Sequence, residues 1–303
     1  MRILPLIILM FLAAMPGGRA QMAVEITADQ EQFLRDEGVR LRVRITNRSG
    51  QAVRLGTDKA WLSFAVDNHD GGGISRIGEV GVEGAFTLDS GHVATRHVDL
   101  AEGFDLAEPG RYTVTATVQV KEWASDVSSP PKRIEIVRGT KIWEQEFGVP
   151  AASGLPEIRR YTLQQATFKK QLRLYLRISD AEDRHVFKVL PLGSMVSFSR
   201  PEAQLDGNSD LSVIFQTGAR SFLFHIIRSN GDIAVRQTYD YTATRPMLKL
   251  NDEGRIYVSG GVRRYTATDQ PPLPPPTIST NALATASNAP VVAKPSDDKP
   301  RGK

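Results

Sequence analysis

Residues 111–120 have the sequence RYTVTATVQV, in which apolar and polar side chains alternate. Tyr112, Val114, Ala116 and Val118 fall on one side of this alternation, and threonines and a glutamine fall on the other. Successive side chains of a β-strand point to opposite faces of its sheet, so the pattern predicts a strand with one buried and one solvent-facing side. Such strands are typical of antiparallel rather than parallel sheets.

The same alternation returns on both sides of this stretch, in residues 40–46, 62–66 and 134–136. Clusters of Asn, Asp, Gly and Pro separate these runs and supply the turns that connect short strands. We therefore predict an antiparallel β-sandwich over residues 21–138. Trp61 lies out of phase with the apolar positions that follow it, and is expected to point away from the core.

Two features of this region resemble known folds. Tyr112 follows the tight turn formed by Pro109 and Gly110, which is the position of the tyrosine corner in immunoglobulin-like (Ig-like) sandwiches. Residues 41–55 and 63–68 resemble the opening strands of bacterial extracytoplasmic Ig-like modules, and also the BsuPI-type proteinase-inhibitor fold. The resemblance covers about a third of the chain and implies an Ig-like fold for residues 21–138.

Alternation of period two also dominates residues 139–268, most clearly in 171–179. Further β-forming runs lie at 186–190, 211–216, 221–228, 233–241 and 255–259. No segment keeps the helical period of about 3.6 residues, so we expect no long helix. The sequence therefore predicts a second antiparallel β domain, and an all-β chain.

A faint internal repeat lies within this second region. The polar turns at residues 206–210 and 252–254 each precede a β-run, and their starts are 252 − 206 = 46 residues apart. This layout resembles the blades of sialidase-type propellers. The 130 residues of 139–268 hold about three such units, whereas a closed propeller needs about four blades or more. We therefore expect a compact antiparallel sheet or sandwich, with partial propeller-like blades as the alternative.

The N-terminus has the three parts of a secretory signal peptide. Arg2 gives the positive start, residues 3–14 form the apolar run, and Gly18 and Ala20 are the small residues that signal peptidase requires. The run is shorter than the ~20 residues that span a membrane. We therefore expect residues 1–20 to be removed, the protein to be exported to the periplasm or the exterior, and no transmembrane segment to remain.

The C-terminal residues 269–303 are rich in Pro, Ser, Thr and Ala and poor in large apolar side chains. Such a composition cannot build a packed core, so we expect a disordered tail. A spacer or inert tail is preferred here to a partner-binding Pro motif.

Charge is distributed unevenly along the chain. Residues 21–138 hold 14 Lys and Arg against 18 Asp and Glu, a balance of −4, whereas residues 139–268 hold 18 against 13, a balance of +5. The two regions are therefore able to dock electrostatically, or the second to attract an anionic partner, although an ordinary solvated surface explains the same balance.

The sequence contains no convincing motif for catalysis or for a cofactor. It has no cysteine, no Gly-x-Ser-x-Gly elbow and no phosphate-binding loop. Carboxylates lie on predicted turns and strand ends at Asp206, Asp210, Asp232, Asp240 and Asp252. A glycosidase would need two of them across a cleft, which sequence spacing cannot test. We therefore expect no cofactor, and favour a protein that is not an enzyme.

The candidate cation site is the loop that contains Asp67, His69 and Asp70. Its carboxylates and the neighbouring glycines suit calcium, which prefers hard oxygen ligands. However, the twelfth position counted from Asp67 is Gly78, where an EF-hand loop needs its closing Glu. A solvated hairpin turn explains the same residues, so we predict no metal site.

Two groups of Arg and Tyr are candidate binding surfaces. Arg173, Tyr175 and Arg177 alternate with apolar residues and are expected to point outward from one strand. The second group is Arg236, Tyr239, Tyr241 and Arg245. Arg and Tyr together recognise anionic groups and sugars by forked hydrogen bonds and stacking. The expected partner is therefore an anionic glycan or an extended peptide, and no nucleic acid is expected.

These observations favour an exported, non-catalytic binding or structural protein of the bacterial envelope or exterior. One alternative is an extracellular hydrolase that acts on glycans, based on the blade-like turns and their carboxylates. A second alternative is a proteinase inhibitor, which the BsuPI-type resemblance implies.

Overall fold

The computed structural model describes residues 21–82, 84–150 and 156–271. The expected signal peptide, and all but the first three residues of the expected tail, lie outside these ranges. The described chain is all-β, as predicted. Its helical segments in these ranges are two short 3-10 turns, Leu100–Glu102 and Lys121–Trp123, and neither has the length or apolarity of a membrane span.

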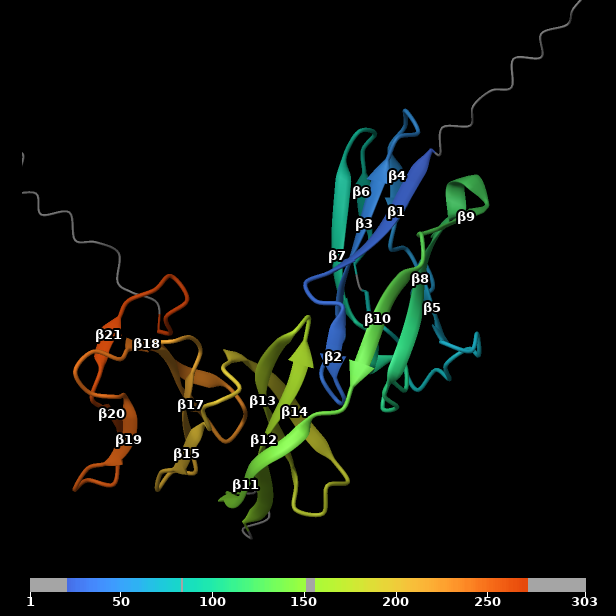
Figure 1. The fold of residues 1–303 in the computed structure, drawn as a ribbon. Helices are drawn as coiled ribbons and strands as arrows, with labels where there is room; N and C mark the ends of the chain where they lie inside the picture. Colours follow the sequence, from blue (N-terminus) through green and yellow to red (C-terminus); the bar gives the residue numbers. More distant parts are fainter. Residues whose placement is uncertain (1–20, 83, 151–155, 272–303) are drawn as a thin grey trace, which may run out of the picture.

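The first part of the chain forms a sandwich of two main sheets (Figure 1). One sheet has the order β1-β3-β7 and the other β2-β10-β8-β5, with β9 on β8 and a small β4-β6 pair beside them. The strands are β1 Met22–Ala28, β2 Gln32–Leu34, β3 Arg40–Asn47, β4 Val53–Leu55, β5 Leu62–Asn68, β6 Phe86–Leu88, β7 Val93–Asp99, β8 Gly110–Val120, β9 Ser125–Ser128 and β10 Lys132–Val137. Their pairing is antiparallel except between β2 and β10.

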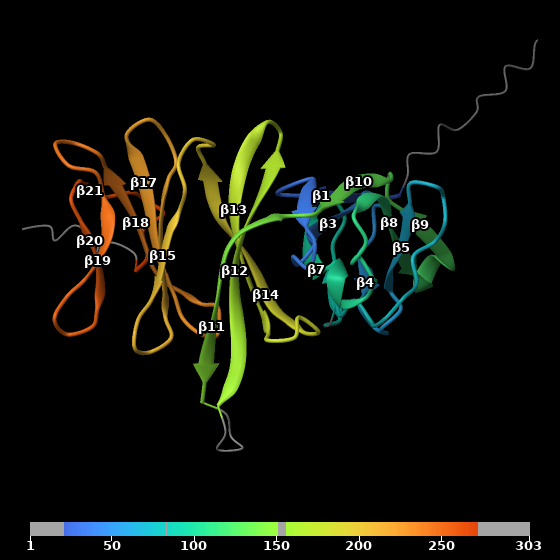
Figure 2. The same ribbon diagram turned by 60° about the horizontal axis from the view of Figure 1, so that its bottom comes forward.

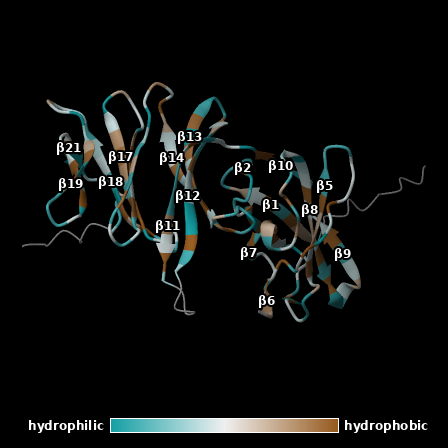
Figure 3. Ribbon diagram, turned by 90° about the horizontal axis from the view of Figure 1, so that it is seen from below, coloured by the Kyte–Doolittle hydropathy of each residue, from teal (hydrophilic) through white to brown (hydrophobic). Residues whose placement is uncertain are grey.

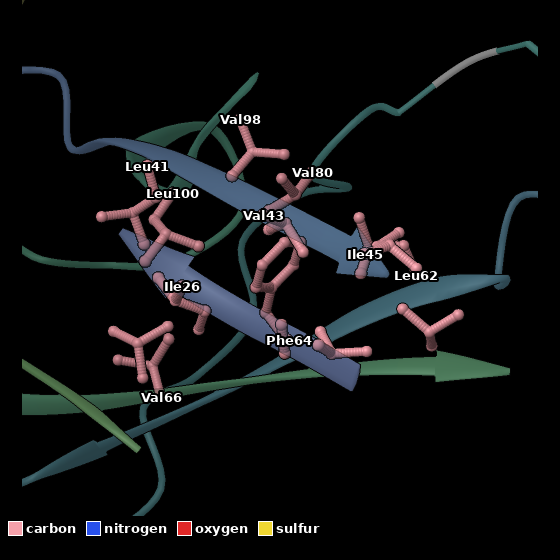
Figure 4. Packing of buried hydrophobic residues seen from close by; sticks show 14 of the residues in the cluster. Ile26, Leu41, Val43, Ile45, Leu62, Phe64, Val66, Val80, Val98 and Leu100 are labelled. Atoms are coloured by element: carbon pink, nitrogen blue, oxygen red, sulfur yellow. The ribbon is translucent and has the colours of Figure 1, made fainter. Parts of the chain in front are cut away.

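The alternating positions of these strands form one apolar core. Figure 4 shows Val43 of β3 and Phe64 of β5 among the side chains that fill the space between the sheets. Tyr112 is buried as expected, and its hydroxyl donates to the backbone oxygen of Glu108 at 2.6 Å, which is the bond of a tyrosine corner. Full burial of an aliphatic side chain such as Val43 contributes about 1.5–3 kcal/mol to the free energy of folding.

The expected orientation of Trp61 was wrong. This side chain is only 2% exposed, and its indole Nε1 donates to the backbone oxygen of Val82 at 3.1 Å. Trp61 lies just before β5 begins at Leu62, so strand alternation does not yet fix its direction. Its ring packs edge-on against Phe86, with centroids 5.7 Å apart.

The second part of the chain is a stack of three antiparallel sheets (Figure 2). The first meander is β11-β12-β13-β14, and the second meander is β15-β16-β17-β18 with β21 at its edge. The terminal hairpin is β19-β20. The strands are β11 Thr140–Val149, β12 Glu157–Phe168, β13 Gln171–Asp180, β14 Val186–Met195, β15 Glu202–Leu205, β16 Leu211–Gln216, β17 Ser221–Ile227, β18 Ile233–Asp240, β19 Met247–Leu250, β20 Ile256–Ser259 and β21 Val262–Arg264.

Two separate apolar layers hold this stack together. Leu174 of β13 packs with Phe215 of β16 between the meanders, whereas Phe224 of β17 packs with Leu248 of β19 between the second meander and the terminal hairpin. β16 is buried along its whole length because both of its faces are covered. Figure 3 shows hydrophilic and hydrophobic residues both present along the strands, as alternation between two faces requires.

The 46-residue repeat corresponds to equivalent places in the fold. The turn at 206–210 joins the first two strands of the second meander, and the turn at 251–255 joins the two strands of the terminal hairpin. The second part therefore has three layers rather than the two of a sandwich. Stacked consecutive meanders also occur in propellers, so the alternative of partial blades stays a prediction for this part.

Candidate binding surface

The first predicted group, on β13, does not face solvent. Tyr175 is 2% exposed and Arg177 is 9% exposed, so the expectation that this strand presents an open surface was wrong. Tyr175 packs with Leu34 of the sandwich and Val189 of β14. The leucines of β13 face the second meander while the Arg and Tyr residues face the sandwich, and so both faces of this strand are covered.

These basic side chains contact an acidic segment of the same chain. Arg177 donates from Nε to Asp36 Oδ2 at 3.3 Å and also pairs with Asp183. Arg173 donates to Gln30 Oε1 at 3.2 Å, and its guanidinium lies over the ring of Phe168. The first candidate surface is therefore the junction between the sandwich and the first meander. It realises the electrostatic docking that the charge balance allowed.

A buried carboxyl completes this junction. Glu37 accepts hydrogen bonds from the Leu34 backbone at 2.7 Å and from Gln30 Nε2 at 2.8 Å. Burial raises the pKa of Glu37, and these two hydrogen bonds oppose that effect. Because Gln30 also receives the bond from Arg173, the amide links the carboxyl to the basic strand.

The second predicted group is divided between the two faces of β18. Arg236 pairs across the ladder with His225, and His225 shares its face with Leu223 and Ile227, which face the first meander. Tyr239 lies on the opposite face, toward the terminal hairpin. Tyr241 and Arg245 follow β18 in an exposed loop. The structure thus brings only part of this group to one surface.

His225 is a packed residue without a polar partner. Its side chain is fully buried, and neither ring nitrogen has a hydrogen-bond partner within the described ranges. The imidazole stacks parallel to the ring of Phe215, with centroids 5.9 Å apart. Burial, and secondarily the charge of Arg236, lower the pKa of His225 to about 3. It is therefore a neutral ring at physiological pH.

An uncovered surface lies on the face of the second meander that carries Tyr239. The terminal hairpin covers the β16 and β17 side of this face, whereas the β18 and β21 side stays partly exposed. We call this part the open face, and it consists of Val235, Gln237, Tyr239, Arg263 and Tyr265. Tyr239 and Arg263 are cross-strand partners, and Tyr265 is 61% exposed.

The polar groups of the open face are arranged by local contacts. The Tyr239 hydroxyl donates to Gln237 Oε1 at 2.9 Å, and burial raises the pKa of this tyrosine. The Arg263 guanidinium lies over the Tyr265 ring, 4.5 Å from its centroid, and donates to Asp269 at 3.3 Å. Burial alone would raise the pKa of Asp269, but hydrogen bonds from Thr266 and Arg263 outweigh it and hold that pKa below its usual value.

One further basic residue borders the open face. The Arg245 guanidinium lies 5.4 Å from the centroid of Phe222 and donates to Ser199 Oγ at 3.2 Å. Phe222 is the cross-strand partner of Tyr239, so Arg245 stands at one end of the same face. Arginines above aromatic rings suit contacts with carboxylates and with planar groups.

Sequence reasoning missed Arg263 and Tyr265, which lie in the short last strand and in the segment after it. Three residues are too few to establish an alternating pattern, so no periodic signal identifies β21. The recurrence of Arg and Tyr on both sides of residue 260 was the available hint.

The loop proposed for a cation is a self-contained turn. Asn68 Oδ1 accepts hydrogen bonds from the backbone nitrogens of Asp70 at 3.1 Å and of Gly72 at 2.8 Å. Among the residues that the structure describes, no three His, Cys, Asp or Glu side chains are grouped so that they could hold a metal ion. His69 instead borders an open groove of about 1100 Å³ between the sandwich and the tip of the β12–β13 hairpin.

Two of the lysines that line this groove are paired within it, whereas Arg111 and Arg133 also line it. Glu31 accepts from Lys132 at 2.9 Å and pairs with Lys169 at 3.6 Å. Lys132 and Lys169 are thus engaged with a carboxylate of the groove itself. The open face, where Tyr265 and Arg245 are accessible, is the better candidate for a ligand.

Comparison with models of known protein families found none that matches this chain, and comparison with curated protein sequences likewise found no match.

Proposed function

We propose that this chain is an exported, non-catalytic binding protein of the bacterial envelope or exterior, and that it binds its partner at the open face. The observation that carries the proposal is a sheet face on which Tyr265 is exposed and Tyr239 and Arg263 are half-buried, while the other half of the face is buried under the terminal hairpin. Export is proposed from the signal-peptide features of residues 1–20. The sandwich supports an Ig-like assignment through the Tyr112 corner.

The partner classes that suit this surface are an anionic glycan and an extended peptide. Both offer carboxylate or hydroxyl acceptors for Arg263 and Arg245, and both can lie flat across tyrosine rings. Because the groups are exposed, their attraction to an anion should weaken as salt rises above about 0.1 M.

The test is an array of anionic glycans and extended peptides, probed with the exported form at two salt concentrations. Tyr265→Ser should abolish binding of the hits. Ile77→Ser is a matched control, since Ile77 is 65% exposed on the sandwich and Tyr265 is 61% exposed. Equal loss of binding in both variants, or in neither, would place the surface elsewhere.

The hydrolase alternative has one supporting observation. The pKa of Asp210 is raised by burial and by neighbouring Asp206. Both residues belong to the β15–β16 turn, where Asp206 Oδ1 accepts from the backbone nitrogens of Asn208 and Asp210, each at 2.9 Å. This bonding is that of a structural turn. Product formation from array hits, abolished by Asp210→Asn, would establish the hydrolase in place of the binding protein.

A further inference from the structure

The terminal hairpin has fewer strands than the sheets on which it is stacked. The first meander has the strands β11 to β14, whereas β19 pairs only with β20 in the described part of the chain. A similar polar turn joins β15 to β16 and β19 to β20, so the repeat makes these two pairs of strands equivalent. In the second meander β16 pairs next with β17, and the corresponding side of β20 has no strand among the described residues.

The two edges of the terminal hairpin differ in their backbone groups. The Asn251 nitrogen donates to the Arg255 oxygen at 2.9 Å and closes the turn. Along an antiparallel ladder, pairs that are hydrogen-bonded to each other alternate with pairs that are not. Counting from the bonded pair Asn251 and Arg255, the next bonded pair is Lys249 and Tyr257, whose N–H and C=O groups point to each other. The residues between these pairs, Leu248 on β19 and both Ile256 and Val258 on β20, direct their backbone N–H and C=O groups outward.

The outer edge of β19 is capped, and no cap lies on that of β20 within residues 21–82, 84–150 and 156–271. Glu202 of β15 accepts the Leu248 N–H at 2.9 Å, which confirms the outward direction of that group. Since the β19 edge faces Glu202 of β15, the β20 edge points the opposite way, across β17 toward β18 and β21. That is where the open face lies, and so, in the described part of the chain, a strand edge without a partner borders a partly exposed apolar and aromatic surface.

This juxtaposition suits one ligand geometry. A strand added beside β20 would bond to Ile256 and Val258, and every second side chain would pack onto Val235 and Tyr239. It would extend the existing interface between the terminal hairpin and the second meander, to which Val235, Tyr239 and Val258 already contribute. A sugar ring stacks on tyrosine equally well, but it offers no regular row of N–H and C=O groups to an open strand.

The charges around the edge indicate the chemistry of the added strand. Lys249 is exposed on β19, and Arg245 has hydroxyl and aromatic contacts rather than a carboxylate partner in the described residues. Arg263 stands on the open face itself, where its guanidinium already pairs with Asp269 at 3.3 Å. Acidic side chains on the bound strand would therefore be complementary to the rim of the site.

We propose that the partner is an extended polypeptide segment of another protein, with apolar residues alternating with acidic and other polar residues, which binds by adding a strand to β20 over the open face. This inference rests on the proposed function and assigns the class of partner. The residues directly after Pro271 are a poor substitute, because prolines at 272, 274, 275 and 276 lack the N–H that a ladder requires, and truncation at Pro271 tests the residues farther along the chain.

The test uses a capped eight-residue peptide in which valine alternates with threonine and glutamate, titrated against the exported chain. Two further peptides carry N-methyl groups on alternate residues, one on the odd set and one on the even set. Strand addition uses the N–H groups of only one set, so one methylated peptide should bind at least tenfold more weakly and the other should bind as the parent does. Equal binding of the two overturns the proposal.

A protein variant gives an independent measurement. Val258→Pro removes an outward N–H and should abolish peptide binding, whereas Val258→Thr keeps the backbone and should retain it. Thermal melting of both variants shows whether the fold is preserved. If Val258→Pro does not fold, the methylated peptides still decide the matter.

Three other outcomes would overturn the inference in favour of a specific alternative. Glycan binding that depends on Tyr265, without any peptide binding, would leave the proposed function standing and exclude strand addition. Peptide binding only by a chain that ends at Pro271 would show that the following residues of the same chain occupy the edge. A mass of two chains in solution, which the peptide dissociates, would assign the edge to a second copy.

Discussion

Arg177 of β13 donates to Asp36 across the junction between the sandwich and the first meander, at 3.3 Å from Nε to Oδ2. The two residues are 141 positions apart in the sequence, and the Arg177 side chain is only 10% exposed. This contact joins the acidic part of the chain to the basic part. Neither charge excess is therefore, by itself, evidence for an external ligand.

We expect Arg177→Ala to destabilise the protein by about 2 kcal/mol, because it removes the shared partner of Asp36 and Asp183 at a mostly buried site and leaves Asp36 only Arg35, at 3.6 Å. Denaturant midpoints measure the change. Arg184→Ala is the control, since Arg184 is 77% exposed and its pairing with Glu182 should contribute little. An unchanged midpoint for Arg177→Ala, or an equal shift in the two variants, would contradict the interface role.

We expect Tyr112→Phe to cost about 1 kcal/mol, because its hydroxyl is bonded to the Glu108 oxygen and the replacement leaves that site otherwise unchanged. Tyr257→Phe is the matched control, since Tyr257 is 46% exposed on the outer face of the terminal hairpin. Urea unfolding at neutral pH compares the two. A loss no greater than that of the control would show that the corner hydrogen bond does not stabilise the sandwich.

The strands and the sandwich core could be predicted from the sequence, because period-two alternation reports directly which side of a strand is buried. The β8 residues Tyr112 and Val114 are examples, and both are buried as expected. The repeated turns around Asp206 and Asp252 could also be predicted, because the residues that form a turn are adjacent in the sequence.

The candidate site could be predicted only in part, because alternation separates two faces without saying what covers each. Arg177 was placed outward correctly with respect to the second meander, yet the sandwich covers that side. Tyr239 was among the predicted candidates, but its neighbours Arg263 and Tyr265 come from a return of the chain to the edge of the second meander. Such long-range pairing leaves no periodic trace in a short strand.

We expect His225 to make the protein less stable in acid. Its folded pKa is about 3, while an unfolded histidine has a pKa of about 6.5, so between these values the unfolded state binds a proton that the folded state does not. Stability from this source is intact above about pH 6.5 and is lost as the pH falls, at about 1.4 kcal/mol per pH unit.

His225→Leu should therefore remove about 2 kcal/mol of the stability difference between pH 7 and pH 5. Urea unfolding of both proteins at the two pH values gives the comparison. The carboxyl groups are common to both proteins, so their contributions to the pH dependence of stability cancel. Replacement of the exposed His92 by Leu should leave the difference unchanged. A pH dependence that is the same with and without His225 would mean that the ring is protonated in the folded state.

Glu202 should hold the outer edge of the terminal hairpin closed. Its carboxylate accepts the outward Leu248 N–H at 2.9 Å, so an acidic side chain occupies the place where another strand would pair. Glu202→Ala should therefore speed hydrogen exchange of the Leu248 amide and destabilise the protein by about 1 kcal/mol. Glu202→Gln keeps an acceptor and should restore most of the protection, whereas Glu253→Ala, at the exposed hairpin turn, should change neither quantity. Unchanged Leu248 exchange in Glu202→Ala would show that the carboxylate does not protect the β19 edge.

The same variant also tests the difference between the two edges of the terminal hairpin. Because the cap on β19 leaves β20 as the open side, Glu202→Ala should let the alternating peptide bind at a second edge, with a stoichiometry above one peptide per chain. A stoichiometry that stays at one would show that the difference between β19 and β20 has another cause than Glu202.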